Sequence, residues 1–205
     1  MEFTGRGAKT LSGSDRMVLW NLAVEPAAKA RIFEADEIAL QYLKERGREP
    51  KAIFSSDPDA VYAREYTFDL SKIQPVAARP DFVDDVVPAK EVCGVRIDEA
   101  FLGSCNNGRI DDLRVGAAIV KGRKVADDVR FLVVPASQEV YLQALNEGLI
   151  ATFMESGAIV MNPNCSVCWG SCQGVIGENE VLISTGTRNF KGRAGHPSSK
   201  VYLGS

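Results

Sequence analysis

The fold is indicated by residues 100–121, which read AFLGSCNNGRIDDLRVGAAIVK. This stretch begins with a short apolar run, passes through a loop of glycine, serine and asparagine, and ends with apolar residues at helical spacing. It predicts a strand at 100–102 and a helix at 111–121. One cysteine, Cys105, lies in the loop between them.

The same alternation continues toward the C-terminus. We expect strands at 130–134, 158–161 and 181–184, helices at 138–147 and 149–156, and a polar loop after the last strand. Such alternation predicts the α/β class, with a mostly parallel sheet flanked by helices and functional loops beyond the carboxyl ends of its strands.

The chain divides into three predicted parts. Residues 1–75 predict a smaller N-terminal α/β segment, with helices at 15–32 and 36–44 and a short strand at 66–70. Residues 76–90 are rich in proline and aspartate and lack hydrophobic periodicity, which predicts a linker. Residues 91–205 then form the main α/β domain.

Composition excludes several classes of protein. The 205 residues carry 24 Lys and Arg against 27 Asp and Glu, and a net charge of −3 gives no footprint for nucleic acid or an anionic membrane. No segment approaches the roughly 18 apolar residues of a membrane span, and the first residues lack the pattern of a signal peptide, so we expect a cytoplasmic protein. The only histidine, His196, excludes a zinc site of two Cys and two His, and its polar surroundings predict a surface position.

Three of the five cysteines are candidates for chemistry. Cys105 would lie beside backbone N–H groups at a helix start, which favour a thiolate, although a Gly/Asn turn with an incidental cysteine is an equal reading. Cys165 and Cys168 form a C-x2-C pair after a strand, which suits a metal centre or a thioredoxin-like redox pair. For Cys93 and Cys172 we expect buried, inert packing, although Cys172 is near enough in sequence to supply a further ligand.

Three thiolates at one site have a particular consequence. A 4Fe-4S cube normally takes four cysteine ligands, so a cube held by three leaves one iron open to hydroxide or substrate. That iron acts as a Lewis acid toward the hydroxyl and carboxylate groups of a hydroxy acid, which is the chemistry of adding and removing water.

Two further groups of polar residues stand out. Arg188 and Arg193 lie in a loop after the last strand and suit planar recognition of carboxylates, although a solvated basic loop is the simpler reading. Asn21 and Glu25 are spaced i, i+4, on one face of the first predicted helix, and could equally be a polar surface pair.

These pieces, in this order, resemble the aconitase and 3-isopropylmalate dehydratase family over nearly the whole chain. The resemblance rests on residues 21–25, 103–114, 121–125, 134–140, 164–170 and 188–193. The chain departs from the usual family pattern at Pro26, Asn106, Asn164 and Thr187.

The resemblance implies a hydro-lyase that isomerises a 2-hydroxy di- or tricarboxylate through an unsaturated intermediate, most similar to 3-isopropylmalate dehydratase. It implies a 4Fe-4S cluster held by Cys105, Cys165 and Cys168. Substrate carboxylates would be bound by Arg188 and Arg193, and the active site would be lined by Asn21 and Glu25.

The resemblance also implies partners. Family large subunits begin with a long segment bearing Asp-His and His motifs, and a small subunit or swivel domain contributes the serine thought to act as base. Neither is present in this sequence, so we expect a cluster-bearing fragment or one piece of a split protein, inactive in isolation. The alternatives are a non-catalytic iron-sulfur or other metal-binding module, and a structural remnant that only packs against a partner.

Overall fold

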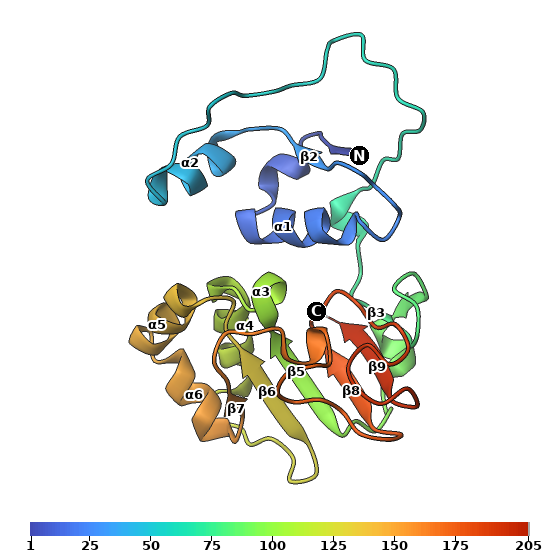
Figure 1. Ribbon diagram of the computed structural model, residues 1–205, viewed down its shortest axis with the longest axis vertical. Coiled ribbons are helices and arrows are strands. Elements are labelled where there is room, and N and C mark those ends of the chain that lie inside the picture. The colour runs from blue at the N-terminus through green and yellow to red at the C-terminus, as the bar shows by residue number, and fades with distance from the viewer. Residues whose placement is uncertain (205) are drawn as a thin grey trace. The chain divides into compact units, whose positions relative to one another are not determined.

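The computed structural model, which describes residues 1–204, divides into two compact units, Met1–Ile73 (unit 1) and Gln74–Ser205 (unit 2) (Figure 1). Each unit has its own secondary structure. Among the described residues, no helix is long and apolar enough to cross a membrane.

Unit 2 is built on a seven-stranded sheet in the order β4-β3-β9-β8-β5-β6-β7. The five strands from β9 to β7 run parallel, and β3 pairs antiparallel with both β9 and β4. Its strands and α-helices are, in chain order, β3 (Val76–Ala78), β4 (Val86–Pro88), β5 (Glu99–Gly103), α3 (Ser104–Asn107), α4 (Ile110–Val120), β6 (Arg130–Val134), α5 (Gln138–Asn146), α6 (Leu149–Ser156), β7 (Ile159–Val160), β8 (Val181–Ser184) and β9 (Lys200–Gly204). The predicted α/β class is confirmed.

The order of the strands reverses at β5. From β5 the chain adds β6 and β7 on one side, and then returns to place β8 and β9 on the other side. In open α/β sheets, ligands bind beyond the carboxyl ends of the strands at such a switch point. The loops that follow β5 and β8 leave the sheet from neighbouring strands at this point.

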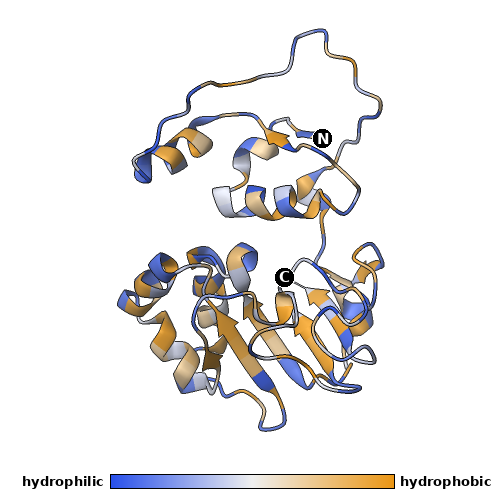
Figure 2. Cartoon of the chain, in the orientation of Figure 1, coloured by the Kyte–Doolittle hydropathy of each residue, from blue (hydrophilic) through white to orange (hydrophobic). Residues whose placement is uncertain are grey.

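Alternation along the strands creates two cores, because successive side chains point to opposite faces of the sheet. Apart from the first residue of β6 and the last of β8, these two strands are hydrophobic (Figure 2). On one face, Leu102 and Val133 pack with the helices α4, α5 and α6. On the other face, Phe101, Leu132 and Val134 are covered by loops, through the buried side chains of Val167, Ile176 and Ala194.

Most elements of unit 2 follow the sequence expectations. The strands at 130–134 and 181–184 and the helix at 149–156 are found with those bounds. The expected polar loop at the end of the chain instead contains β9, whose Val201 is buried against the sheet. We missed this strand because only a short β-branched and aromatic run, Val201 to Leu203, signals it.

Residues 76–90, which we expected to be a linker, carry β3 and β4 in the structure. The two strands extend the sheet antiparallel at its β9 edge, and Ala77 and Ala78 are buried. The boundary between the compact units lies before them, at Ile73 and Gln74. Proline is tolerated here because β4 is an edge strand, where a missing N–H leaves no ladder bond unmade.

Unit 1 contains a two-stranded parallel sheet and two helices. These are β1 (Glu2–Phe3), α1 (Gly13–Leu22), β2 (Ile32–Phe33) and α2 (Glu37–Glu45). The helix expected at 15–32 ends at Leu22, because Pro26 lacks the N–H that a continuing helix would bond to the Leu22 carbonyl. The strand expected at 66–70 is absent: Tyr66 and Phe68 are exposed without a partner strand, and a 3-10 turn, Leu70–Lys72, begins instead.

An ion pair between Arg16 and Asp36 holds unit 1 together. The Nη1 and Nη2 atoms of Arg16 donate to the two carboxylate oxygens of Asp36 at 2.7 and 2.6 Å, and Nε donates to the Leu11 carbonyl at 3.1 Å. The hydrogen bonds from Arg16 lower the pKa of Asp36 to about 2. Asp36 also accepts from the Ala39 amide, so the same carboxylate caps α2 and ties it to α1.

A second charged group links the amino ends of the strands in unit 2. Glu99 is fully buried at the start of β5 and accepts from Arg130 Nε at 2.9 Å. The Arg130 Nη1 and Nη2 atoms donate to the carboxylate of Glu180 at 2.9 and 2.6 Å. Burial outweighs the attraction of Arg130 and raises the pKa of Glu99 to about 7. The group aligns β5, β6 and the turn before β8 at the edge of the sheet opposite the switch-point loops.

We predict that Glu99→Gln changes the pH dependence of stability. Because the pKa of Glu99 is higher in the folded than in the unfolded chain, the wild type loses stability as the pH rises from about 4.5 to about 7. The glutamine variant lacks this loss, so its free energy of unfolding relative to wild type should rise by at least about 1 kcal/mol between pH 5 and pH 8. Urea unfolding followed by circular dichroism at both pH values measures this difference; an equal difference at both would contradict it.

Candidate functional site

The loop after β5 presents Cys105 at the carboxyl edge of the sheet. Cys105 is the second residue of the short helix α3 and is exposed, whereas its neighbours Ser104 and Asn106 are buried. The loop is held to the neighbouring strand β8, because the Gly103 amide donates at 3.1 Å to Oγ1 of Thr185, the residue that follows β8. Its buried neighbours therefore fix the thiol at the surface.

The loop after β7 presents the other two candidate cysteines. The Cys168 amide donates to the Cys165 carbonyl at 3.0 Å, which closes a 3-10 turn, Ser166–Cys168. Val167, between the two cysteines, is 2 % exposed and belongs to the core beneath the loop. Ser166 is also buried, and its Oγ donates to the Gln173 carbonyl at 2.7 Å. The C-x2-C pair is thus anchored by the residues between its cysteines.

The loop after β8 packs directly on the C-x2-C loop. The Arg193 Nε atom donates to the Cys168 carbonyl at 2.8 Å. Ile176 and Gly195 form a parallel β-bridge, and the Ile176 amide donates to the Ala194 carbonyl at 3.1 Å. One of the two predicted carboxylate-binding arginines therefore contacts the backbone of a predicted cluster ligand.

Gly170 allows this close contact between the two loops. Its φ of +68° is in the left-handed region, and a Cβ atom there would lie 2.4 Å from the Arg193 carbonyl oxygen and 2.9 Å from Ala194 Cα. Any larger residue at position 170 would push the two loops apart.

The thiols influence one another. Burial, together with the thiols of Cys168, Cys105 and Cys172, raises the pKa of the Cys165 thiol, and the charge of Arg193 lowers it. Cys105 lies on the loop after β5, and Cys165 and Cys168 lie on the loop after β7, which Arg193 contacts through the Cys168 carbonyl. All five cysteines are free thiols.

Two sequence expectations for cysteine were wrong. Cys93 and Cys172, expected to be buried, are both exposed. Cys93 lies at the end of a 3-10 turn, Ala89–Val92, and is not among the thiols that affect Cys165. Cys172 lies in an exposed segment between Gly170 and Gly174, both of which have positive φ.

The site also has donors and acceptors that lack partners among the described residues. Asn106 Nδ2, Asn107 Oδ1 and Arg109 Nε are buried polar atoms with no hydrogen-bond partner, and all three follow Cys105 in the chain. Buried polar groups in native proteins are normally satisfied, so such atoms beside a thiol indicate a bound group. Within residues 1–204, no three His, Cys, Asp or Glu side chains converge as a single metal ion requires.

Asn189 is a positioning residue that the sequence analysis missed. Its side chain is fully buried, and Nδ2 donates to the carbonyls of Arg79 and Phe82 at 2.7 and 3.2 Å. This ties the arginine loop to the turn between β3 and β4. Next to it, Arg188 Nη1 donates to Oγ1 of the buried Thr187 at 2.9 Å. The one signal in the sequence for a buried Asn189 was that it is an uncharged amide within the basic run at 188–193.

Asn21 and Glu25 lie in unit 1, not together on one helix. Asn21 is in the last turn of α1, whereas Glu25 follows the helix end, where its amide donates to the Leu22 carbonyl at 3.0 Å. Pro26 and the positive φ of Ala27 redirect the chain directly afterwards. The exposed His196 pairs with Ser198 Oγ at 2.8 Å and lies at the surface, as expected.

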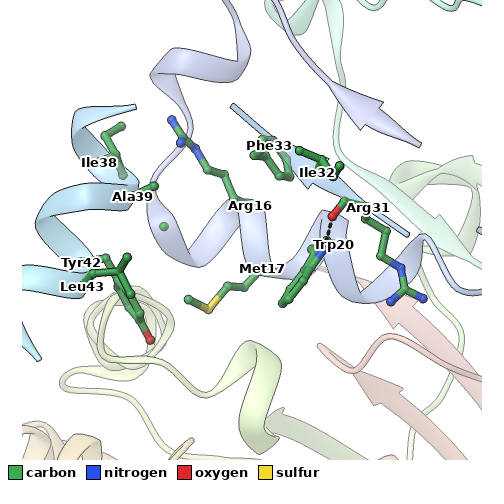
Figure 3. Close-up of a pocket in the computed structure, with 11 residues that line it drawn as sticks. Arg16, Met17, Trp20, Arg31, Ile32, Phe33, Ile38, Ala39, Tyr42 and Leu43 are labelled. Carbon is green, nitrogen blue, oxygen red and sulfur yellow. Dashed lines mark hydrogen bonds between the residues drawn. The ribbon is translucent and has the colours of Figure 1, made fainter. Parts of the chain in front are cut away.

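Unit 1 also has an apolar pocket of about 380 Å³, between α1, β2 and α2 (Figure 3). It is lined by Met17, Trp20, Phe33, Ile38, Tyr42 and Leu43, among others, and the Trp20 indole donates to the Arg31 carbonyl at 2.7 Å. Neither Asn21 nor Glu25 lines it. The pocket therefore adds nothing to the predicted site.

Comparison with known proteins finds one family model and several relatives that match nearly the whole chain. A model of the aconitase family (aconitate hydratase) matches residues 1–95 and 89–205. The "Probable 3-isopropylmalate dehydratase large subunit" of Methanothermobacter thermautotrophicus is 50% identical over 204 residues, 100% of this chain and 49% of the relative. The "Probable methanogen homoaconitase large subunit" of the same organism is 47% identical over 203 residues, 99% of this chain and 47% of the relative.

A third relative also carries the name of a 3-isopropylmalate dehydratase large subunit. The 3-isopropylmalate dehydratase large subunit of Sulfurihydrogenibium sp. is 44% identical over 205 residues, 100% of this chain and 48% of the relative. The chain thus spans about half the length of the curated relatives it matches.

We predict that Gly170→Ala destabilises unit 2 more than a matched glycine change. Gly122 also has a positive φ, but a Cβ atom added there would meet nothing within 4 Å, so Gly122→Ala should cost only the left-handed strain, about 1–2 kcal/mol. Gly170→Ala adds a clash with the Arg193 and Ala194 backbone and should cost at least about 1 kcal/mol more. Thermal unfolding of both variants measures the difference, and equal costs would show that the loops do not pack as described.

Proposed function

The chain belongs to the aconitase family, and from this we propose that it is the cluster-bearing part of a 4Fe-4S hydro-lyase large subunit. Its substrate is a 2-hydroxy di- or tricarboxylate, which is dehydrated and rehydrated in a reaction like that of 3-isopropylmalate dehydratase. The observation that carries the proposal is the hydrogen bond from Arg193 Nε to the Cys168 carbonyl, which joins the arginine loop to the C-x2-C loop, while Cys105 lies on the loop after β5, the strand next to β8.

The residues present fit a cluster better than a single ion. The three cysteines come from two loops, and each could ligate one iron of a cube; within the described residues no three His, Cys, Asp or Glu side chains lie as a single metal ion requires. The unpartnered donors Asn106 Nδ2 and Arg109 Nε suit the sulfur atoms of a cluster, which accept hydrogen bonds. When bound, the cluster supplies a Lewis-acidic iron, which weakens the carbon–oxygen bond of the leaving hydroxyl.

The arginine loop supplies substrate binding. We assign carboxylate recognition to Arg188 and Arg193, because a guanidinium makes two parallel hydrogen bonds to a carboxylate. Arg193 uses Nε to hold the Cys168 carbonyl, and we assign its two Nη groups to the carboxylate. Burial of Asn189 and Thr187 on this loop limits its motion and so orients Arg188.

We also propose a role for two polar residues of unit 1. The family resemblance assigns Asn21 and Glu25 to the active site, and we retain that assignment. A carboxylate such as Glu25 can accept or return a proton at the leaving oxygen, and an amide such as Asn21 can orient a hydroxyl. Glu25 lies beyond the end of α1 at Leu22, so its backbone is not held in helical geometry.

The complete enzyme needs further polypeptide. The relatives are named as large subunits and are about twice as long as this chain. We therefore propose that the active assembly contains the remaining part of a large subunit and a small subunit or swivel domain, which supplies the base for the carbon-bound proton.

The cluster assignment predicts a specific pattern among the cysteine variants. After anaerobic reconstitution, serine at Cys105, Cys165 or Cys168 should abolish the visible absorption of the cluster, because each removes one iron ligand. Cys93→Ser is the matched control and should leave the spectrum unchanged, and Cys172→Ser should keep the cluster. If Cys172→Ser alone emptied the site, the assignment of the three ligands would be wrong.

Substrate binding by the arginine loop predicts a loss of kcat/KM. In the complete assembly, Arg188→Lys should lower kcat/KM at least about tenfold, or about 1.4 kcal/mol, since lysine cannot make two parallel hydrogen bonds. The exposed Arg123 serves as control, and Arg123→Lys should have wild-type kinetics. Equal kinetics for both variants would assign residues 187–196 to a solvated surface.

The chain alone should show no turnover even with its cluster intact. Its residues account for substrate binding and for the metal site, but no residue has a supported assignment as the base. Assays with isopropylmalate, homocitrate and citrate, with and without the remaining large-subunit segment and a small subunit, test this. Robust turnover by the chain alone would reveal a base within these 205 residues.

A further inference from the structure

Unit 1 lacks a hydrophobic core of its own. Of its residues, all of which the structure describes, only Arg16 and Ala23 are buried. Both hydrophobic cores of the described chain consist of residues of unit 2. A compact unit of this size is stable only when it buries a substantial apolar surface. The packing that stabilises unit 1 must therefore come from outside the unit.

The sheet of unit 1 is also incomplete. It consists of two parallel strands, β1 and β2, of two residues each, and α1 connects them. Parallel sheets occur almost only as larger sheets that are covered on both faces. Among the described residues, each strand has one edge without a partner strand. The order β1-α1-β2-α2 is therefore that of two consecutive βα units of a larger parallel sheet.

The two faces of this small sheet differ. On one face, the rings of Phe3 and Phe33 stack with their centroids 4.6 Å apart, and the Arg16 guanidinium lies 5.7 Å from the Phe33 ring. Because successive side chains alternate across a strand, Glu2 and Ile32 point to the opposite face. The side chain of Ile32 is half exposed there. This face therefore leaves apolar surface that a parallel sheet normally buries.

Both helices of unit 1 also leave their apolar side chains uncovered. No residue of α2 is buried, and the only buried residue of α1 is Arg16. Met17 and Trp20 of α1 and Tyr42 of α2 line the apolar pocket of unit 1 (Figure 3). A helix in a folded domain normally buries its apolar stripe against another element. Unit 1 thus has an open sheet, an open sheet face and two open helices.

The rest of a large subunit fits this surface better than other parts of the same chain or a second copy. All described strands of unit 2 belong to its own sheet. A second copy related by a two-fold axis would meet its equivalent strand antiparallel, which does not continue a parallel sheet. The relatives named as large subunits contain about as much polypeptide again as this chain, which is enough for further βα units.

We propose that the part of the large subunit outside this chain completes unit 1: it adds parallel strands to the β1-β2 sheet and covers Ile32 and the exposed side chains of α1 and α2. This inference rests on the proposed function, which places that polypeptide in the assembly, and it names the surface that binds it. Asn21 and Glu25, which we assign to the active site, lie in unit 1. Binding of the missing part therefore also orders these two residues.

Hydrogen exchange of the full chain, with and without this partner, tests the proposal. The partner used is the half of the Methanothermobacter thermautotrophicus large subunit that lies outside its match to this chain. In the chain alone, the amides of α1 and β2 should exchange at least about tenfold faster than those of β5 and β6, because unit 1 has no core. Adding the partner should protect the amides of β1, β2 and α1. Equal protection of both units in the chain alone would overturn the inference, since unit 1 would then need no partner.

A substitution on the open face tests the surface itself. Ile32→Lys should raise the Kd for the same partner at least about tenfold, because it would bury a charge among apolar side chains. Ile119 is similarly exposed on α4 of unit 2, so Ile119→Lys is the matched control and should keep the wild-type Kd. Isothermal titration calorimetry measures both.

Three outcomes would contradict the proposal in distinguishable ways. An unchanged Kd for Ile32→Lys would overturn the proposed surface and leave the proposed assembly standing. A dimer of the chain that protects β1 and β2 without the partner would identify a second copy as the occupant and would also overturn the inference. No binding of the partner to the wild-type chain would overturn the proposed assembly itself, and this inference with it.

Discussion

The burial of Val167, Ile176 and Ala194 against the sheet is the contact on which the site depends. These side chains cover Phe101, Leu132 and Val134 on the face of the sheet opposite α4, α5 and α6. Each fully buried aliphatic residue of this size contributes about 1.5–3 kcal/mol, which is enough to order a loop without regular secondary structure. The loops that carry the cysteines and arginines are therefore part of the core, and their functional residues are positioned by packing.

This arrangement couples the loop proposed to bind the cluster to the loop proposed to bind the substrate. Arg193 contacts the Cys168 backbone, Gly170 lets the two loops approach, and Ile176 bridges to Gly195. A shift in the position of one loop must therefore move the other loop as well. Preorganisation of this kind favours a reaction in which a carboxylate and a hydroxyl of one substrate must be held at a fixed separation.

Much of unit 2 could be predicted from the sequence because its elements have strong local signals. The strands at 130–134 and 181–184 are apolar runs, and the apolar periodicity of residues 149–156 predicts α6. The elements that were missed depend on distant partners: β3 and β9 are short and pair only with each other and their neighbours in the finished sheet. The strand that we wrongly predicted at 66–70 has the same explanation, since an alternating pattern forms a strand only where a partner strand exists.

The candidate site shows a similar division between local and tertiary information. Motifs led us to propose Cys105, Cys165, Cys168, Arg188 and Arg193, because residue type and spacing indicate the chemistry. They could not reveal Asn189, which acts through the backbone of the β3–β4 turn. Nor could they reveal that Cys172 is exposed, since this follows from how the loop after Cys168 folds.

The central claim is that the three thiols on two loops at one edge of the sheet hold a four-iron cluster. Its most direct test is a count of iron and acid-labile sulfide per chain after anaerobic reconstitution and desalting. The account predicts about four irons and four sulfides per chain, with the broad visible absorption of a cubane cluster. Stoichiometric binding of zinc in preference to iron, or a count of two irons and two sulfides, would contradict it.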